Sequence, residues 1–446
     1  MRILLKILLL GICMLQPMGM AAASALHPGS VPKTAVRATT AKPAASSELL
    51  RVGLLKGQPK ITISATAPFV LRDAATQQGL AKFAANESVQ LFVKNHQLIL
   101  NQKAISATRL ELAFASKGTA AYVKVNGRQY RGTLQLQLLP AGIQAINVVP
   151  LEEYLYSVLP SEMSPSWPTE ALKAQAVAAR TFALYDRNKH KSEGFELCAT
   201  THCQAYEGVG KETAEARAAV DAVRGQVLEY NGKPIYAAFH ASSGGMTANS
   251  EDVWGSQLPY LRAVKDDDTQ SPSHHWQVKF TLPALQLKLQ RAGYDTGLLK
   301  RIDLTPLPSG GGRTVDRSVS GRVQIIKFVG ARQTAVLTGN EARQALGLKS
   351  TLFDLRIVRP EVPFQLGNGS KLSTQKLPDV EEKNFVSERQ HVVSGQAGES
   401  VLIDGYGWGH GLGLSQWGAK AMAEHGKDYK AILALYYPNT QLKNMD

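Results

Sequence analysis

One carboxylate in this 446-residue chain has unusual neighbours. Glu162 lies between Pro160 and Pro165, which restrict the backbone on both sides. Partial burial beside Met163 and Trp167 would raise the pKa of the carboxyl into the range that suits proton donation. The sequence therefore predicts a catalytic acid on a stiff loop between two helices. A solvated loop acid, or an acid that starts the next helix, is the alternative.

A second segment of chemical interest lies far downstream, where glycines alternate with polar and aromatic residues between Gly407 and Gly418. Aromatic faces stack on sugar rings, and amide and imidazole groups bond hydroxyls. Trp408, His410 and Gln416 therefore favour a carbohydrate groove. A phosphate loop is less well supported because no G-K-[ST] follows, and a packed glycine-rich turn is the bland alternative.

Two further segments carry polar residues that could contact a ligand. His240, Ser242 and Ser243 precede two glycines at the end of an expected strand, where backbone can approach a ligand closely. A nucleophilic serine is disfavoured because the G-x-S-x-G elbow is missing; a tight turn is the alternative. Arg180 lies in an alanine-rich helix and could clamp a carboxylate or sugar, or steady Glu162. A structural ion pair competes with that interpretation.

The cysteines allow three interpretations. Cys198 and Cys203 flank His202, and His190 lies upstream. Two thiolates with one or two imidazoles suit tetrahedral zinc, whereas two nearby cysteines in an exported protein also fit a disulfide. We favour a structural zinc over a disulfide and over a catalytic thiol, and either His202 or His190 remains open as the third ligand.

The N-terminus indicates export. Residues 1–25 have a positive start, a short apolar core and an Ala-Ser-Ala end, which is typical of a secretory signal peptide. The apolar run is shorter than the ~20 residues of a membrane span. Residues 26–49 read as a flexible linker. We therefore expect a protein of the periplasm or cell wall with no integral membrane span after signal cleavage.

The net charge of +14 draws the chain toward polyanions. For an exported protein these are wall polymers or lipid head groups. The basic residues are spread along the chain, and no aromatic-and-basic nucleic-acid module is present, so nucleic acid is not an expected partner.

The elements that must position these residues fall into two parts. Residues 50–140 alternate as strands do, with a hairpin at Asn126-Gly127. Residues 141–446 are the expected catalytic region, with a polar insertion near 361–387. Its expected elements are helices at 150–160, 169–185, 213–223, 415–426 and 429–437, and a hairpin over 226–240. Strands and helices without regular alternation predict an α+β fold, in which a strand-rich N-terminal part is interleaved with a helical core around a glycan groove.

Taken in order, these segments resemble the SpoIID/LytB family, named for a sporulation protein and an amidase enhancer. The resemblance covers residues 50 to the C-terminus, and residues 50–140 fit either a separate domain or, as we favour, part of one interleaved catalytic fold. The segments that carry it are Leu151–Leu155, Val158–Met163, Leu172–Thr181, Cys203–Gly208, His240–Gly245 and Gly409–Ala419.

The resemblance implies a peptidoglycan lytic transglycosylase that prefers glycan strands stripped of stem peptides and leaves 1,6-anhydromuramyl ends. Glu162 matches the catalytic acid, and Cys198, Cys203 and one histidine match a zinc-associated segment that orders the groove. There are two alternatives. One is a non-catalytic enhancer of a cell-wall amidase. The other is a zinc hydrolase of stem peptides, which is disfavoured because the sequence has no H-E-x-x-H motif. The residues expected to contact glycan are Arg180, Gln204, Tyr206, His240, Ser242, Ser243, Trp408, His410 and Gln416.

Overall fold

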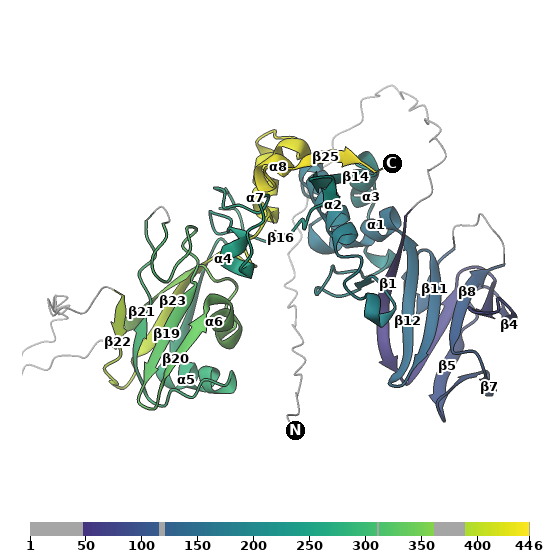
Figure 1. Cartoon of the computed structure of the whole chain (residues 1–446), viewed down its shortest axis with the longest axis horizontal. Helices are drawn as coiled ribbons and strands as arrows, with labels where there is room; N and C mark the ends of the chain where they lie inside the picture. Colours follow the sequence, from purple (N-terminus) through teal and green to yellow (C-terminus); the bar gives the residue numbers. More distant parts are fainter. Residues whose placement is uncertain (1–47, 116–120, 310–311, 361–388, 446) are drawn as a thin grey trace, which may run out of the picture. The chain divides into compact units, whose positions relative to one another are not determined.

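The computed structural model describes residues 48–115, 121–309, 312–360 and 389–445 (Figure 1). The expected signal peptide, nearly all of the linker and the insertion near 361–387 lie outside the described residues. From residue 47 onward the chain forms one compact unit of mixed strands and helices, which confirms the α+β prediction. No helix in the described ranges is long and apolar enough to cross a membrane.

Residues 49–150 supply most of two β-sheets, drawn purple to blue in Figure 1. Alternation buries one face of each strand, as with Ile61 and Ile63. The larger sheet has the order β13 (Leu197–Cys198), β1 (Leu49–Gln58), β12 (Gly142–Pro150), β11 (Thr133–Leu139), β8 (Arg109–Phe114), β3 (Phe69–Asp73), β4 (Gly79–Phe83). The smaller has the order β10 (Arg128–Tyr130), β9 (Val123–Val125), β2 (Lys60–Ala65), β5 (Val89–Lys94), β6 (Gln97–Leu100), β7 (Lys103–Ile105).

The expected hairpin at Asn126-Gly127 is confirmed. These residues have φ values of 47° and 83° between β9 and β10, and a two-residue turn with both φ values positive matches the twist of the flanking strands.

The cysteine segment is built into the edge of the larger sheet. β13 pairs in parallel with β1, which sets Leu197 opposite Val52 and Cys198 opposite Gly53. A Cβ at Gly53 would lie 2.8 Å from the ring of Phe195, so only glycine admits this strand. The strand-rich part and the cysteine segment therefore share one apolar core.

The first helix corrects the predicted setting of Glu162. α1 (Leu151–Glu162) runs through Pro160, where we expected it to end. Proline removes one intrahelical hydrogen bond, but the N–H of Met163 still donates to the carbonyl of Leu159 at 3.0 Å and holds the last turn. Glu162 is therefore the last residue of a helix, not part of a loop.

α2 (Thr169–Tyr185) is the central helix of the first core. Its alanines are buried, and small side chains let neighbouring helices approach closely. It packs against α1, α3 (Ala214–Ala222), α7 (Gln416–Glu424) and α8 (Tyr429–Tyr436). Side chains cap the N-termini of the last two helices. For α7 the side chain of Ser415 accepts the N–H of Gly418, and for α8 the side chain of Asp428 accepts the N–H of Ala431.

The hairpin expected over 226–240 is only partly present. β14 (Gln226–Tyr230) pairs with β15 (Lys233–Pro234) across Asn231-Gly232, but the second arm ends at Pro234. The N–H groups of Ala237 and Ala238 bond to carbonyls two residues earlier, so the backbone turns away. β25 (Gln441–Asn444) takes the other edge of β14, while β16 (Phe239–His240) pairs in parallel with β24 (Leu414–Ser415).

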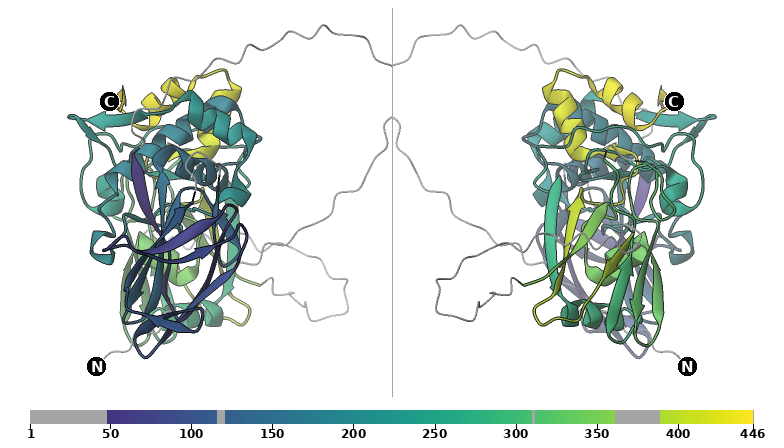
Figure 2. Two further views of the ribbon diagram at one scale, coloured as in Figure 1. Left: turned by 90° about the vertical axis from the view of Figure 1, so that its right-hand side faces the viewer. Right: turned by 90° about the vertical axis from the view of Figure 1, so that its left-hand side faces the viewer.

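Residues 275–406 build a second apolar core, mostly green in Figures 1 and 2. The glycine-rich segment follows directly, because it begins at Gly407, after the last residue of β23. The elements of the second core are β17 (His275–Thr281), α5 (Leu282–Arg291), β18 (Leu299–Asp303), β19 (Ile325–Gly330), β20 (Thr334–Thr338), α6 (Gly339–Leu346), β21 (Phe353–Val358), β22 (Gln390–Val392) and β23 (Ser400–Tyr406); α4 (Ser250–Trp254) precedes them.

Candidate functional site

Glu162 lies at the junction of three segments that are far apart in the sequence. The N–H of Ala205 lies 3.4 Å from its Oε1, and the side chain of Gln416 also bonds to the carboxylate. Burial raises the pKa of Glu162, and these two hydrogen bonds oppose the increase. The negative end of the α1 dipole also disfavours the charged form at this position. A partly buried carboxyl with a raised pKa is suited to donate a proton.

Short strand pairing brings Gln416 to Glu162. β24 lies against β16, so Phe239 and His240 stand opposite Leu414 and Ser415. The N–H of Trp417 donates to the carbonyl of Ala241 at 3.1 Å, which extends the pairing by one step. Gln416 therefore starts α7 from a fixed position.

Trp417, the neighbour of Gln416 in the sequence, packs against Trp167. Their ring centroids lie 4.8 Å apart in an edge-on arrangement. The structure thus brings together Glu162, Ala205 and Gln416, which the sequence placed in three separate motifs.

Gln204 and Tyr206, the two neighbours of Ala205 in the sequence, hold its N–H in position. Both are almost fully buried. The amide of Gln204 accepts from Tyr154 Oη at 3.1 Å and donates to the carbonyl of Ala179 at 3.2 Å. Tyr206 Oη donates to Asn147 Oδ1 at 2.8 Å. Because neither side chain reaches the surface, their geometry assigns them to positioning and not to direct contact with glycan.

Arg180 is also fully buried, and its geometry favours the ion-pair interpretation. Its guanidinium donates twice to Glu152, at 2.8 and 2.6 Å, and once to the carbonyl of Gln226 at 3.1 Å. Glu152 also accepts from the N–H of Gly225. With no exposed surface, Arg180 ties α1 and α2 together, so we do not retain it as a glycan contact.

Ser242 and Ser243 are anchored by acids that our sequence analysis did not identify. Ser242 Oγ donates to Asp268, and Ser243 Oγ donates to Asp266 Oδ2 at 2.6 Å. Asp268 also accepts the N–H groups of the two following glycines. Both serines are buried, so this turn serves as a support for the glycine-rich segment.

His240 and His410 face each other across that segment, with ring centroids 5.6 Å apart. Burial lowers the pKa of His410 to about 4, with help from Arg322 and Arg343, and burial lowers that of His240 well below its usual value. Since His240 Nδ1 lies 3.1 Å from the carbonyl of Leu412, it carries the proton there, and Nε2 remains a buried acceptor without a partner. Both imidazoles are neutral at pH 7. His410 Nδ1 accepts the N–H of Leu412 at 2.9 Å and the ring also bonds the backbone of Phe239, so its nitrogens already have partners within the chain.

Two tryptophans give this region exposed aromatic surface. Trp408 is 52% exposed, and its backbone pairs with Ser242 through two hydrogen bonds. Trp254, at the end of α4, is 42% exposed and lies 5.8 Å from the His410 ring. The sequence motifs pointed to Trp408. Trp254 belongs to no motif, and only its contact with His410 identifies it.

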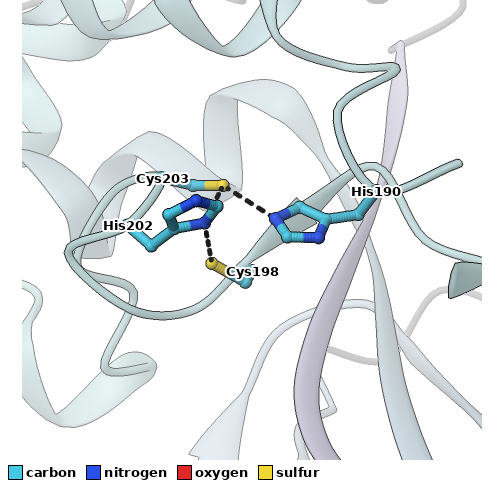
Figure 3. A group of neighbouring side chains, drawn as sticks. All are labelled: His190, Cys198, His202 and Cys203. Carbon is cyan, nitrogen blue, oxygen red and sulfur yellow. Dashed lines mark hydrogen bonds between the residues drawn. The ribbon is translucent and has the colours of Figure 1, made fainter. Parts of the chain in front are cut away.

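The cysteine segment brings four potential metal ligands together (Figure 3). His190, Cys198, His202 and Cys203 point toward one another, and all four ligand atoms lie within 4.8 Å of each other. Cys203 Sγ lies 3.4 Å from His190 Nε2, and Cys198 Sγ lies 3.6 Å from His202 Nδ1. Tetrahedral zinc holds such atoms about 3.5 Å apart, given its bond lengths. Cys198 and Cys203 are free thiols, and both His190 and His202 belong to the group of four potential ligands.

The surroundings of the four ligands also fit a metal. His190 Nδ1 lies 2.7 Å from Glu193 Oε1, which leaves Nε2 turned toward the cysteines. Metal-binding histidines commonly donate their other N–H to a carboxylate. Burial opposes ionisation of Cys198, but hydrogen bonds from Thr200 and His202 lower the pKa of its thiol to about 6. Burial and the neighbouring Cys198 raise the pKa of the Cys203 thiol to about 12, so without a metal only one of the two ionises readily.

Comparison with known proteins gives consistent matches. The family model described as stage II sporulation protein matches residues 140–230. An amidase enhancer of Bacillus subtilis is 33% identical over 344 residues, which are 73% of this chain and 45% of that protein. Stage II sporulation protein D of Bacillus amyloliquefaciens is 30% identical over 320 residues, 68% of this chain and 76% of its own. An uncharacterised protein of Brachyspira hyodysenteriae is 30% identical over 394 residues, covering 88% and 92%.

The buried ion pair makes a prediction about stability. Replacing Glu152 by Gln leaves the Arg180 charge buried and uncompensated, so we expect the free energy of unfolding to fall by about 3 kcal/mol. Urea unfolding monitored by circular dichroism measures this. As a matched control, Glu251→Gln removes the acid from a part-exposed pair with Arg262 and should cost less than ~1 kcal/mol. Equal losses in the two variants would contradict the structural role of the pair.

The raised pKa of Glu162 makes a second prediction. The folded protein holds the proton to a higher pH than the unfolded chain does, so stability falls as pH rises between the two pKa values. Glu162→Gln removes this penalty and should be more stable than wild type at pH 7, by up to about 1.4 kcal/mol per unit of pKa shift. Urea unfolding at pH 4 and pH 7 tests it. A difference that does not grow with pH would contradict the raised pKa.

Proposed function

The chain belongs to the SpoIID family, and from this we propose that it is a peptidoglycan lytic transglycosylase with a cell-wall function. Its substrate would be the bond between N-acetylmuramic acid and N-acetylglucosamine in glycan strands stripped of stem peptides. The observation that carries the proposal is the setting of Glu162: one carboxyl with a raised pKa, fixed by Ala205 and Gln416.

In the first step Glu162 acts as a general acid. Its proton moves to the glycosidic oxygen, and the bond from that oxygen to C1 of the muramyl residue breaks. The N-acetylglucosamine portion leaves with a new hydroxyl, and positive charge develops at C1. The carboxylate left behind is stabilised by the Ala205 N–H and the Gln416 amide.

In the second step the same carboxylate acts as a base. It takes the proton from the muramyl C6 hydroxyl, whose oxygen attacks C1 and closes the 1,6-anhydro ring. Glu162 regains its proton, and no water is consumed. One acid therefore suffices, whereas glycoside hydrolases usually need two carboxylates.

The glycine-rich segment would hold the sugar rings. Trp408 and Trp254 present exposed aromatic faces for stacking, and the ring of His410 packs beside Trp254. The segment is continuous with Gln416, so a strand bound there would extend toward Glu162.

We also propose that the four-residue cluster binds a structural zinc through Cys198, Cys203, His190 and His202. The ion would cross-link the segment that ends at Ala205. The proposed reaction consumes no water, so it needs no metal-activated hydroxide. As for location, the proposed substrate agrees with the predicted signal peptide and with an exported protein.

An amidase enhancer is the second candidate, because one relative carries that name. In that case the site would bind glycan without cleaving it and would act beside a cell-wall amidase. Intact Glu162, with its two hydrogen bonds and raised pKa, favours the enzyme.

Product analysis tests the enzyme directly. Mass spectrometry of peptide-stripped glycan treated with wild type should show 1,6-anhydromuramyl ends, and Glu162→Gln should lower their rate of formation at least ~100-fold because proton transfer is lost. The rate should also fall as pH rises through the raised pKa of Glu162, since the acid must be protonated. Glu207→Gln, a neighbouring acid whose side chain is 41% exposed, serves as the control and should keep near-normal activity.

The alternatives give other products. Reducing ends would indicate hydrolysis. No products from wild type, together with stimulation of an added amidase, would replace the enzyme by the enhancer.

Zinc binding is tested by metal analysis. We expect one zinc per chain in the purified protein, and loss of it in Cys203→Ser. Chelation should lower the Tm by at least about 2–4 °C, which corresponds to ~1 kcal/mol or more. His275→Gln removes a half-exposed histidine outside the cluster and should retain the metal. A chain without metal whose mass is two hydrogens lower would indicate a disulfide instead.

A further inference from the structure

Asp266 joins three segments that are far apart in the sequence. Its Oδ2 accepts from Ser243 Oγ at 2.6 Å, and its Oδ1 accepts from Tyr436 Oη at 2.6 Å. The side chain of Ser415 bonds to the same carboxylate. These three hydroxyls belong to the turn after β16, to the last residue of α8 and to the residue that caps α7. One carboxylate therefore ties the turn after β16 to both C-terminal helices.

The backbone of Asp266 is fixed as well. Its N–H donates to the carbonyl of Gly245 at 3.0 Å. The preceding residue, Lys265, forms an antiparallel bridge with Met246. Because the main chain is bound to the turn on this side, the carboxylate has a defined position from which to hold the two helices.

The first turn of α7 packs directly on this carboxylate. A Cβ at Gly418 would overlap both Asp266 Oδ1 and Tyr436 Oη, so only glycine lets the helix come this close. A negative charge beside the N-terminal end of a helix is also favoured by the helix dipole. Packing, the bond from Ser415 and the charge of Asp266 thus act together on the start of α7.

The start of α7 determines where Gln416 lies. Gln416 is the first residue of the helix, and its side chain bonds to the Glu162 carboxylate. Ser415 precedes it directly and also accepts the N–H of Gly418 at 3.4 Å as the helix cap. Since consecutive Cα atoms are ~3.8 Å apart, a displaced Ser415 would carry Gln416 with it.

We propose that Asp266 is a positioning residue, which holds Gln416 against Glu162 through Ser415. Its catalytic consequence rests on the proposed function, but the contact between Gln416 and Glu162 does not. Without Asp266, the start of α7 would loosen and the amide would no longer stay within hydrogen-bond distance of the proposed acid.

Two effects of Asp266 on Glu162 would have opposite signs. The bond from Gln416 lowers the pKa of Glu162, so losing that bond should raise it. A negative charge acting through space raises the pKa of another carboxyl, so losing the charge of Asp266 alone should lower it. The direction of the change therefore distinguishes positioning from a direct charge effect.

Other titratable groups face the two acids. Tyr154 lies near Glu162, but burial raises its pKa well above the usual value, so it stays neutral while Glu162 titrates. Burial raises the pKa of Asp266, its three hydrogen bonds oppose the rise, and the charge of Asp268 adds to it. Neither neighbour is altered in the variants below.

Carboxyl ¹³C NMR of glutamate-labelled protein tests the proposal without any turnover. The Glu162 signal, identified by its loss in Glu162→Gln, is followed between about pH 3 and pH 8. We expect Asp266→Asn to raise its midpoint by at least ~0.5 pH unit, because one hydrogen bond to the charged form is lost. Gln416→Met should give the same rise, and combining the two should add nothing. Ser415→Ala cuts the link and leaves the acid in place, so it should also raise the midpoint.

A matched control separates positioning from a general loss of stability. Asp316→Asn alters a fully buried aspartate of the second core, which binds the Thr305 N–H, the Thr314 hydroxyl and Arg389. It should lower the free energy of unfolding and leave the Glu162 midpoint unchanged. Circular dichroism confirms that each variant is folded before titration.

Three results would overturn the inference. One is an unchanged midpoint in Asp266→Asn and Ser415→Ala beside a rise in Gln416→Met. The second is a lower midpoint in Asp266→Asn, which would indicate a charge effect through space. The third is a rise in the double variant equal to the sum of the single rises, which would show that the two residues act independently.

Cleavage assays distinguish failure of this inference from failure of the proposed enzyme. If wild type forms anhydromuramyl ends, the fall of its rate with pH should move to higher pH in Asp266→Asn, together with the Glu162 midpoint; a limb that stays in place would count against the positioning role. If wild type forms no such ends, the enzyme is lost, while matching NMR midpoints in Asp266→Asn and Gln416→Met would still support the positioning role.

Discussion

The parallel pairing of β16 with β24 is the contact on which the candidate site depends. Two residues on each strand join the middle of the chain to its C-terminal part. Such a short ladder contributes few hydrogen bonds, so close packing must hold it. A Cβ at Gly413 would lie 2.1 Å from the carbonyl of Ala238, and one at Gly409 would lie 2.8 Å from His240. The glycines therefore serve first to close the fold, and only then do Gln416 and His410 take their places.

The position of Glu162 couples stability to chemistry. A carboxyl at the last residue of a helix is disfavoured as an anion by the helix dipole, and burial adds to that effect. The two hydrogen bonds from Ala205 and Gln416 are weak compensation, since they lower the pKa without restoring it. The folded chain thus holds an unfavourable group where the proposed reaction needs a proton donor, and the surrounding core supplies the stability that offsets its cost.

The sequence predicted local elements well and their partners poorly. Turn chemistry identified the Asn126-Gly127 hairpin, and periodicity identified α2, because both signals are local. The end of α1 was misplaced because the effect of Pro160 depends on the hydrogen bond that Met163 makes afterwards. The second arm after Pro234 was misplaced because a strand's partner is decided by distant residues. Motifs indicated Glu162, Trp408 and all four potential metal ligands. They did not indicate which of the polar side chains in the motifs are buried. That is why Arg180, Gln204 and Tyr206 read as glycan contacts when they lie inside the core.

The metal cluster and the proposed acid are connected through one short piece of backbone. Cys203 lies two residues before Ala205, whose N–H bonds Glu162, and Gln204 between them is held by Tyr154 and Ala179. A metal at Cys203 would fix one end of this piece, and the buried hydroxyl of Tyr206 fixes the other. The Ala205 N–H would therefore stay in place while Glu162 changed charge twice in each cycle of the proposed reaction. Preorganised donors of this kind need no reorganisation at the moment of reaction. The proposed structural metal would thus support the proposed catalysis without any contact with the substrate.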